Sequence, residues 1–263
     1  MVTGLLNSIK MRHWAILAFI AVVASISTVD WTSVTHAGAG TSMRMFVHAL
    51  VNPDISSATL ITAGNAAWIT VAYALAAMTI AIAFGIPLGL IASGTLLPSG
   101  FSNTTLMVSV RAYLGFIRSI HELIWALLLV ASFGLSPAVG VLAIAVPYSG
   151  IIGRVFAERL QDVPTHQLAA FQSTGASSLQ LAVGVRIPSV LPDITSYLFY
   201  RFECAVRTAV VLSFVGLGGI GFQIHIALSD LKFETVATLL YTLVILVVAI
   251  DVFGGFIRKR MIA

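Results

Sequence analysis

The sequence HQLAAFQSTGASSLQLAVGVRIPSVLP, residues 166–192, decides the fold because its composition separates it from the apolar stretches on either side. Gly175 is expected to form a hinge between two short helices. Ser177 is followed three residues later by Gln180, a capping-box pattern in which side chains satisfy backbone donors at a helix start. The stretch is expected to end at its prolines, Pro188 and Pro192. It therefore predicts two small amphipathic helices that form a docking element on a membrane surface.

Composition assigns the whole chain to the membrane proteins. Hydrophobic residues make up 59% of the sequence and charged residues 9%, with a mean hydropathy of +1.01, whereas charged residues are about a quarter of a soluble domain. The single cysteine, Cys204, excludes an internal disulfide framework and a cysteine-rich metal site. The net charge of +4 comes from basic residues scattered beside apolar runs, so no nucleic-acid partner is expected. We predict an all-α integral protein of a lipid bilayer.

Six apolar stretches are predicted to cross the bilayer, each as a transmembrane helix. They are residues 14–29, 66–92, 111–133, 139–156, 193–215 and 234–257. The first is compatible with a cleaved signal peptide, ending near the small residues at 36–39, or with a retained anchor, which we expect. Residues 93–109 are predicted to be a loop, and residues 43–51 an amphipathic helix on the membrane surface. The glycine-rich string GLGGIG, residues 216–221, is predicted to break the helix.

Basic residues predict the orientation of these spans. They concentrate in the N-terminal, 93–111, 154–188 and C-terminal segments, whereas the opposite side of the bilayer holds only Arg44 and Lys232. Because cytoplasmic loops carry the excess of Lys and Arg, both termini and residues 166–192 are predicted to be cytoplasmic. The predicted organisation is a tail and first span at 1–30, an extracytoplasmic loop at 31–63, and a core at 64–260 that includes a cytoplasmic loop at 160–192.

The docking stretch resembles the EAA loop of the permeases of ABC importers. With the pattern placed on Gly175, the matching positions are Ala170, Gly175, Val185, Ile187 and Pro188. The sequence departs from the pattern at Phe171 and at Ala169, where the family has a glutamate that anchors the loop to the ATPase, and Gln167 or His166 is the candidate substitute. The resemblance implies that an ATPase-coupling function is carried by Gln167, Ala169, Ala170, Gly175, Val185, Ile187 and Pro188.

Further strings resemble the phosphonate permease (PhnE) branch of these importers. They are IHELIWA at 120–126, GRVFAE at 153–158, FECAVR at 202–207, GLGGIG at 216–221, and Ile250-Asp251 with Arg258. Two positions depart from the branch, which has proline at His121 and asparagine at Ala205. The resemblance implies the type I importer permease fold of six transmembrane helices with a cytoplasmic coupling helix, in the bacterial inner membrane. It also implies import of phosphonate, phosphite or a similar oxyanion by alternating access.

The implied partners are a second permease subunit, identical or closely related, two cytoplasmic ATPase subunits that carry ATP and Mg²⁺, and an extracytoplasmic substrate-binding protein. The chain itself has no Gly-x-x-x-x-Gly-Lys-Ser/Thr phosphate loop, no catalytic triad and no paired-carboxylate site in a soluble segment. We therefore expect neither a cofactor nor catalytic residues in this chain. A permease for another small solute remains an alternative, as does an ATP-independent secondary transporter, although such a carrier has no need of a docking loop.

Ionisable residues inside the predicted spans are candidates for the translocation path, because a charge in the bilayer is costly and usually faces a partner or water. They are Arg118, His121, Glu122, Arg201, Glu203, Arg207 and Asp251. Spacing predicts that Arg118 pairs with Glu122 and Glu203 with Arg207, and that Asp251 pairs with an arginine. Such pairs either hold helices together or leave an arginine free to attract an oxyanion, whose geometry suits guanidinium. We expect no metal at His121 and Glu122, and no dinucleotide at GLGGIG.

Overall fold

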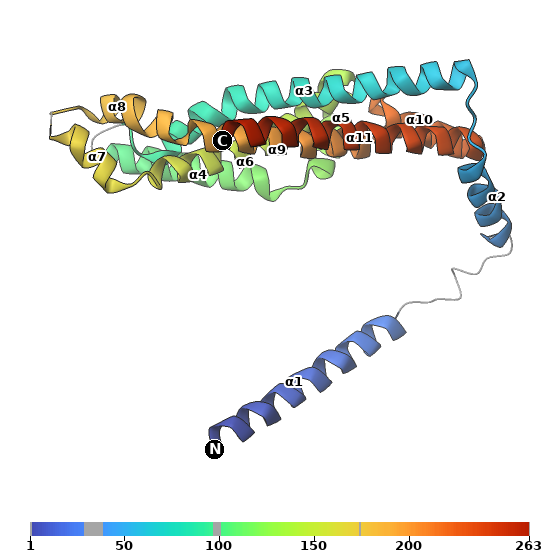
Figure 1. Cartoon of the computed structure of the whole chain (residues 1–263), viewed down its shortest axis with the longest axis horizontal. Helices are drawn as coiled ribbons and strands as arrows, with labels where there is room; N and C mark the ends of the chain where they lie inside the picture. Colours follow the sequence, from blue (N-terminus) through green and yellow to red (C-terminus); the bar gives the residue numbers. More distant parts are fainter. Residues whose placement is uncertain (1, 29–38, 97–100, 174, 263) are drawn as a thin grey trace. The chain divides into compact units, whose positions relative to one another are not determined.

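The structure is a computed structural model that describes residues 2–28, 39–96, 101–173 and 175–262. The chain divides into two compact units, Met1–Val51 and Asn52–Ala263. All regular elements within the described ranges are helices. Figure 1 shows those of the second unit, with α7 and α8 at one end and α10 at the other.

The described residues of the first unit form two helices, α1 (Val2–Ser27) and α2 (Ala39–Val51). The apolar part of α1, Trp14–Ser27, is shorter than the other candidate spans and its side chains are exposed. The expected surface helix at 43–51 is part of α2, which begins four residues earlier. The string at 36–39 that suggested a signal peptide lies almost entirely outside the described residues, and so do the side chains of Lys10 and Arg12.

Three helices of the second unit are long and apolar enough to cross a membrane: α3 (Ser57–Ser93), α6 (Pro137–Gln161) and α11 (Phe233–Ile262). Two bent helix pairs satisfy the same criterion together, which brings the total within the described residues to as many as five. Helix α3 contains the predicted second span, 66–92, and begins nine residues before it, because Ser56 caps α3 by accepting a hydrogen bond from the Thr59 N–H.

The predicted span 111–133 is wrong as a single helix. The structure has α4 (Phe101–Ser119) and α5 (Glu122–Phe133), bent by 88° with respect to each other. The helix restarts because His121 is an N-cap whose Nδ1 accepts the Leu123 N–H at 3.3 Å. The predicted loop 93–109 is also too long, since α4 already begins at Phe101. Leu114 and Ile117 of α4 are buried against the end of α3 and α6.

The second bent pair runs continuously from the docking stretch into the bundle. It comprises α8 (Ser178–Leu181), a π-helical turn η2 (Ala182–Arg186), α9 (Ile187–Leu212) and a second π-helical turn η3 (Ser213–Leu217), followed by α10 (Ile220–Ser229). The expectation that Pro188 and Pro192 close the docking stretch is therefore wrong. A helical proline lacks the N–H that would bond four residues back, and the wide turn η2 ends two residues before Pro188.

The predicted break at GLGGIG is confirmed. Gly216, Gly218 and Gly219 all have positive φ angles, of 100°, 85° and 93°, a conformation that favours glycine. Thr70 of α3 accepts a hydrogen bond from the Ile220 N–H at 3.0 Å. This bond satisfies a backbone donor at the start of α10 and fixes the bend against α3.

The core forms where α3 crosses α6. A Cβ added at Gly89 would lie 2.6 Å from the carbonyl oxygen of Gly153, and one at Gly85 would lie 2.9 Å from that of Ser149. Small residues allow two backbones to approach this closely, which is how membrane helices gain packing contacts. The crossing thus fixes the scaffold from which α5 and α9 present the polar side chains described next.

Candidate functional site

The docking stretch folds as two short helices joined at Gly175, as expected. Helix α7 (Thr165–Gln172) precedes Gly175, whose φ is 79°, and α8 follows it. Both bonds of the predicted capping box are present, from the Gln180 N–H to Ser177 Oγ at 3.4 Å and from the Ser177 N–H to Gln180 Oε1 at 2.8 Å. Local sequence signals thus determine this part of the structure.

One face of the docking stretch packs against the end of α6. Its apolar cluster consists of Phe156, Leu160, Val163, Leu168, Val185, Val190 and Ile194, with Ile187 packed against it. Of the predicted coupling residues, Val185 is therefore part of the core, whereas Gln167, Ala169, Ala170, Gly175 and Pro188 are exposed. The buried face holds the stretch on the bundle, and Gln167, Ala169 and Ala170 of α7 are exposed to its other side.

Two polar side chains connect this end of the bundle to carbonyl groups at helix ends. Arg186 Nη1 donates to the Leu160 carbonyl at 2.5 Å, and Gln161 Nε2 donates to the Ser93 carbonyl at 2.7 Å. The last carbonyls of a helix have no partner within it, so these bonds satisfy groups that would otherwise be unpaired. They join the docking stretch to α6, and α6 to α3.

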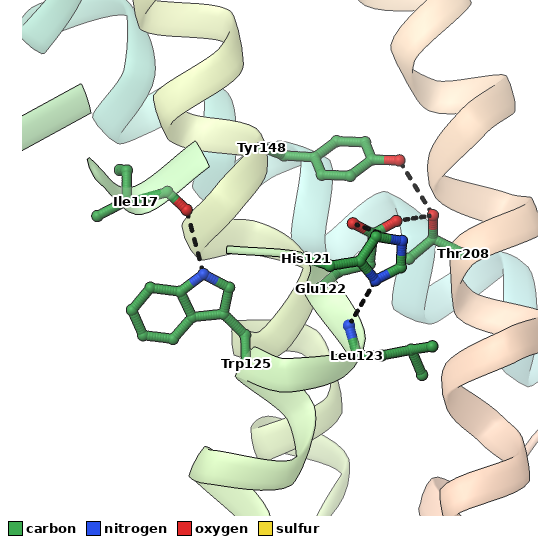
Figure 2. A network of polar contacts seen from close by, with 7 residues as sticks. All are labelled: Ile117, His121, Glu122, Leu123, Trp125, Tyr148 and Thr208. Atoms are coloured by element: carbon green, nitrogen blue, oxygen red, sulfur yellow. Dashed lines mark hydrogen bonds and ion pairs between the residues drawn. The ribbon is translucent and has the colours of Figure 1, made fainter. Parts of the chain in front are cut away.

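A second group of functional candidates surrounds the break between α4 and α5 (Figure 2). A cavity of about 330 Å³ opens there, lined by His121, Glu122, Leu123, Arg207, Thr208, Val211 and Leu212. The structure thus brings the N-terminus of α5 together with α9. The first N–H groups of a helix point outward and carry partial positive charge, which favours an anion beside them.

A chain of hydroxyl groups holds Glu122 at the edge of this cavity (Figure 2). Thr208 Oγ1 donates to Glu122 Oε1 at 3.1 Å, and the Tyr148 hydroxyl lies 3.1 Å from the same Thr208 oxygen. A threonine hydroxyl has one hydrogen, so Tyr148 donates to Thr208, which donates to Glu122. His121 Nε2 lies 3.8 Å from Glu122 Oε2. The carboxylate is thereby oriented by groups from α6 and α9 and by His121 in the break.

Trp125 braces the break itself (Figure 2). Its Nε1 donates to the carbonyl of Ile117 at 3.1 Å. The bend leaves carbonyls at the end of α4 without helical partners, and a broken helix is stable in a membrane when side chains satisfy them. The indole therefore stabilises the bend that positions His121 and Glu122.

The predicted pairing of the membrane charges is wrong in both cases. The bend between α4 and α5 separates Arg118 from Glu122, and no ion pair joins these two described residues. Glu203 and Arg207 each pair with α11 instead of with each other. The Arg258 guanidinium binds the Glu203 carboxylate. Arg207 Nη2 binds both oxygens of Asp251, at 2.7 and 2.9 Å, which confirms that Asp251 pairs with an arginine.

Arg201 lies against aromatic rings instead of a carboxylate. Its guanidinium carbon is 5.1 Å from the ring centre of Tyr148 and 5.7 Å from that of Tyr197. Its Nε is buried without a hydrogen-bond partner in the described structure. Cation–π contacts hold the side chain in place, while the unsatisfied donor retains the capacity to bind an acceptor.

Sequence reasoning missed Tyr148, Thr208 and Arg258 as members of these networks. Tyr148 and Thr208 are neutral residues in apolar helices, and their spacing carries no signal of mutual contact. In the sequence, Arg258 contributes to the predicted orientation of the spans and to the family resemblance. It was not recognised as the partner that the buried Glu203 needs. Among the described residues, no group of three or more His, Cys, Asp or Glu side chains is arranged to hold a metal ion.

The Thr208 hydroxyl is expected to stabilise the site measurably. Replacing Thr208 with valine removes the donor to Glu122 while keeping the shape, and should lower the free energy of unfolding by about 1.5–3 kcal/mol, as for hydrogen bonds to charged groups. Thermal unfolding of the purified chain measures this loss. The matched control is Thr195→Val, since the Thr195 hydroxyl bonds only to the Leu191 carbonyl of its own helix. Equal effects of the two substitutions would contradict the network.

The structure has the features of a helical membrane transport protein. These are apolar helices long enough to span a bilayer, a helix broken beside a polar cavity, and the docking stretch at one end. Residues 85–263 match the family described as binding-protein-dependent transport system inner membrane component. The chain therefore belongs to that family of inner-membrane permeases, which confirms the predicted class and fold.

Three relatives illustrate the similarity. The putative phosphite transport system permease protein HtxC of Stutzerimonas stutzeri is 33% identical over 96% of this chain and 86% of its own length. The phosphite transport system permease protein PtxC of the same organism is 30% identical over 75% of this chain and 72% of its own length. The phosphate-import permease protein PhnE of Mycolicibacterium smegmatis is 29% identical over 73% of this chain, but the match spans 36% of that longer protein.

Solved structures share the fold at lower identity. A chain of the MetNI methionine ABC transporter in an inward-facing conformation matches with a TM-score of 0.67 and 22% identity, covering 79% of this chain and 99% of that one. A bacterial ABC transporter involved in the import of alginate matches with a TM-score of 0.58 and 15% identity, covering 97% of this chain and 98% of that one. These comparisons establish the arrangement of helices.

Proposed function

We propose that the chain is the permease subunit of an ATP-driven importer for a small phosphorus oxyanion such as phosphite or phosphonate. The observation that carries this proposal is the cavity at the α4–α5 break, where an arginine, a histidine, a hydroxyl and a helix N-terminus meet within membrane-spanning helices. Relatives named for phosphite transport support the substrate class. The proposal goes beyond the family, whose members carry chemically different solutes.

The cavity suits transient contact with an oxyanion. Arg207 supplies guanidinium donors, but Asp251 already binds it through both carboxylate oxygens. Glu122 adds a second negative charge to the cavity wall. Both carboxylates weaken the attraction for an anion, so the cavity favours passage over tight binding, since a deep energy minimum would block release. We infer that selectivity resides in an extracytoplasmic binding protein.

The docking stretch is the proposed contact with a cytoplasmic ATPase. Its exposed residues include three large apolar side chains, Phe171, Leu179 and Val183, which are 48%, 58% and 58% exposed. Apolar groups beside polar ones on a surface are typical of protein interfaces. ATP-driven closure of two ATPase subunits would move the docking stretches of two permease subunits together. The spans would then open outward, and hydrolysis would return them to the inward-open state.

Reconstitution tests the proposed function. The chain is assembled in proteoliposomes with its partner ATPase and binding protein, and uptake of phosphite, methylphosphonate, phosphate and methionine is measured. Uptake of a phosphorus oxyanion that requires ATP and the binding protein is expected. Preferential uptake of methionine would refute the substrate class, and uptake without the ATPase would favour a secondary transporter.

Gly175 offers a test of coupling. Gly175→Glu forces a charged side chain into a left-handed backbone conformation at φ 79°, which costs about 1–2 kcal/mol for a residue with a Cβ. We expect ATP-dependent uptake and co-purification of the ATPase to fall at least tenfold, with normal membrane insertion. Gly175→Asn should retain function because asparagine tolerates this conformation.

Ala169→Glu is the matched charge control, because Ala169 is exposed on α7 and the family carries glutamate there. It should preserve ATPase association or tighten it. Loss of assembly in this variant would show that the register assigned to the docking stretch is wrong.

A further inference from the structure

A second polar cavity lies at the end of the bundle that carries the docking stretch. It is largely open to the surface and has a volume of about 470 Å³, comparable to the volumes of small-ligand sites. Its walls are formed by Arg159, Asp193, Ser196, Tyr197, Tyr200 and Arg258, from α6, α9 and α11. None of these residues lines the cavity at the α4–α5 break. The two cavities are therefore separate sites.

Of the three charged residues of this cavity, one already has an ion-pair partner among the described residues and two do not. Arg258 binds Glu203 through Nη1 and retains its other guanidinium donors. Arg159 and Asp193 are exposed and form no ion pair in the described structure. The residues that line the cavity thus include two arginines, a serine, two tyrosines and one aspartate without an ion-pair partner in the described structure.

This combination matches a ligand with both signs of charge. Guanidinium groups bind phosphoryl oxygens through paired N–H donors, and a nearby carboxylate binds an ammonium group. A simple phosphate would meet repulsion from Asp193. We propose that the cavity binds a phosphoryl group that carries a primary ammonium group, with Arg159 and Arg258 on the phosphoryl oxygens and Asp193 on the ammonium.

Two sources supply that chemistry: the headgroup of phosphatidylethanolamine and a free phosphoethanolamine-type compound. The position of the cavity is compatible with a headgroup. Arg159 precedes the end of α6 by two residues, and Arg258 precedes the end of α11 by four. Helix ends of spanning segments lie near headgroup depth, and basic pockets between helices bind phospholipid headgroups there. A free compound would instead reach the cavity from the aqueous phase.

Lipid retention tests the proposal. The full chain is purified in detergent, mixed with equal amounts of dioleoyl phosphatidylethanolamine and dioleoyl phosphatidylcholine, and analysed by native mass spectrometry. The wild type should retain phosphatidylethanolamine about tenfold more than phosphatidylcholine, because a quaternary ammonium has no N–H to donate to Asp193. Asp193→Asn should abolish this preference. Arg159→Gln should reduce retention of both lipids about tenfold, with rescue by Arg159→Lys.

The matched control is Arg154→Gln, because Arg154 is an α6 arginine outside the cavity that pairs with Glu158. Its lipid retention should equal that of the wild type. Soluble phosphoethanolamine, titrated by isothermal calorimetry, separates the two sources: sub-millimolar binding identifies a free compound, and no binding with intact lipid preference identifies the headgroup. Equal retention of both lipids by the wild type, together with no phosphoethanolamine binding, would overturn the proposal.

Discussion

Gly89→Ala is expected to destabilise the permease by about 2–3 kcal/mol, although it adds a single methyl group. The added Cβ would lie 2.6 Å from the Gly153 carbonyl oxygen and 3.1 Å from its Cα. Because the obstructing atoms belong to the backbone of α6, relief requires separation of the two helices, and overpacking in a well-packed core costs amounts of this size. The melting temperature of the detergent-purified chain measures the loss.

The control lies on the same helix. Gly64 of α3 has open space where a Cβ would be added, so Gly64→Ala should leave the melting temperature unchanged or raise it, because alanine has the higher helix propensity. A Gly89→Ala protein as stable as Gly64→Ala would show that α3 and α6 do not approach as closely as described. In the Gly89→Ala variant, solute uptake should fall in proportion to the amount of folded protein.

Arg258→Met is expected to have the largest effect of a charge substitution, about 3–5 kcal/mol of unfolding free energy. The Glu203 side chain is 7% exposed, and its guanidinium partner is Arg258. Removing one partner of a buried ion pair leaves an uncompensated charge, which is the costly case. Chemical unfolding, followed by the fluorescence of the four tryptophans, measures the loss.

A double substitution shows whether the buried charge is the cause. Glu203→Gln combined with Arg258→Met removes both charges, so the double variant should recover much of the lost stability. Lys232→Met serves as a control because the pair of Lys232 with Asp230 is exposed, at 65% and 49%, and such pairs contribute at most about 1 kcal/mol. Equal losses in the single and double variants would contradict this explanation.

Local signals predicted the docking stretch well. The hinge at Gly175 and the capping box at Ser177 and Gln180 depend on residues close in sequence, so spacing alone identifies them. The glycine string at 216–221 is a similar case, since three positive φ angles are a local property. The prediction that the prolines end the docking stretch was wrong, because η2 accommodates Pro188 within a continuous helix. No spacing rule anticipates a π-helical turn of this kind.

Partners across helices could not be predicted. Spacing placed Glu203 beside Arg207 on one helix face, but each finds a more favourable partner on α11, more than 40 residues further along the chain. Likewise, Arg118, His121 and Glu122 were expected within one helix, whereas the structure places a bend of 88° among them. A charge pattern within one helix does not specify which neighbouring helix it faces, so the pairing follows only from the tertiary arrangement.

The unbroken passage from α8 through η2 into α9 makes this segment a lever. Ser178 and Thr208 are thirty positions apart in one helix, a distance of about 45 Å at 1.5 Å per residue. A tilt of about 5° over that length displaces one end by about 4 Å relative to the other, which is comparable to the diameter of a small oxyanion. A tilt of this segment by a few degrees at the docking stretch therefore corresponds, at Thr208, to a movement on the scale of the solute itself.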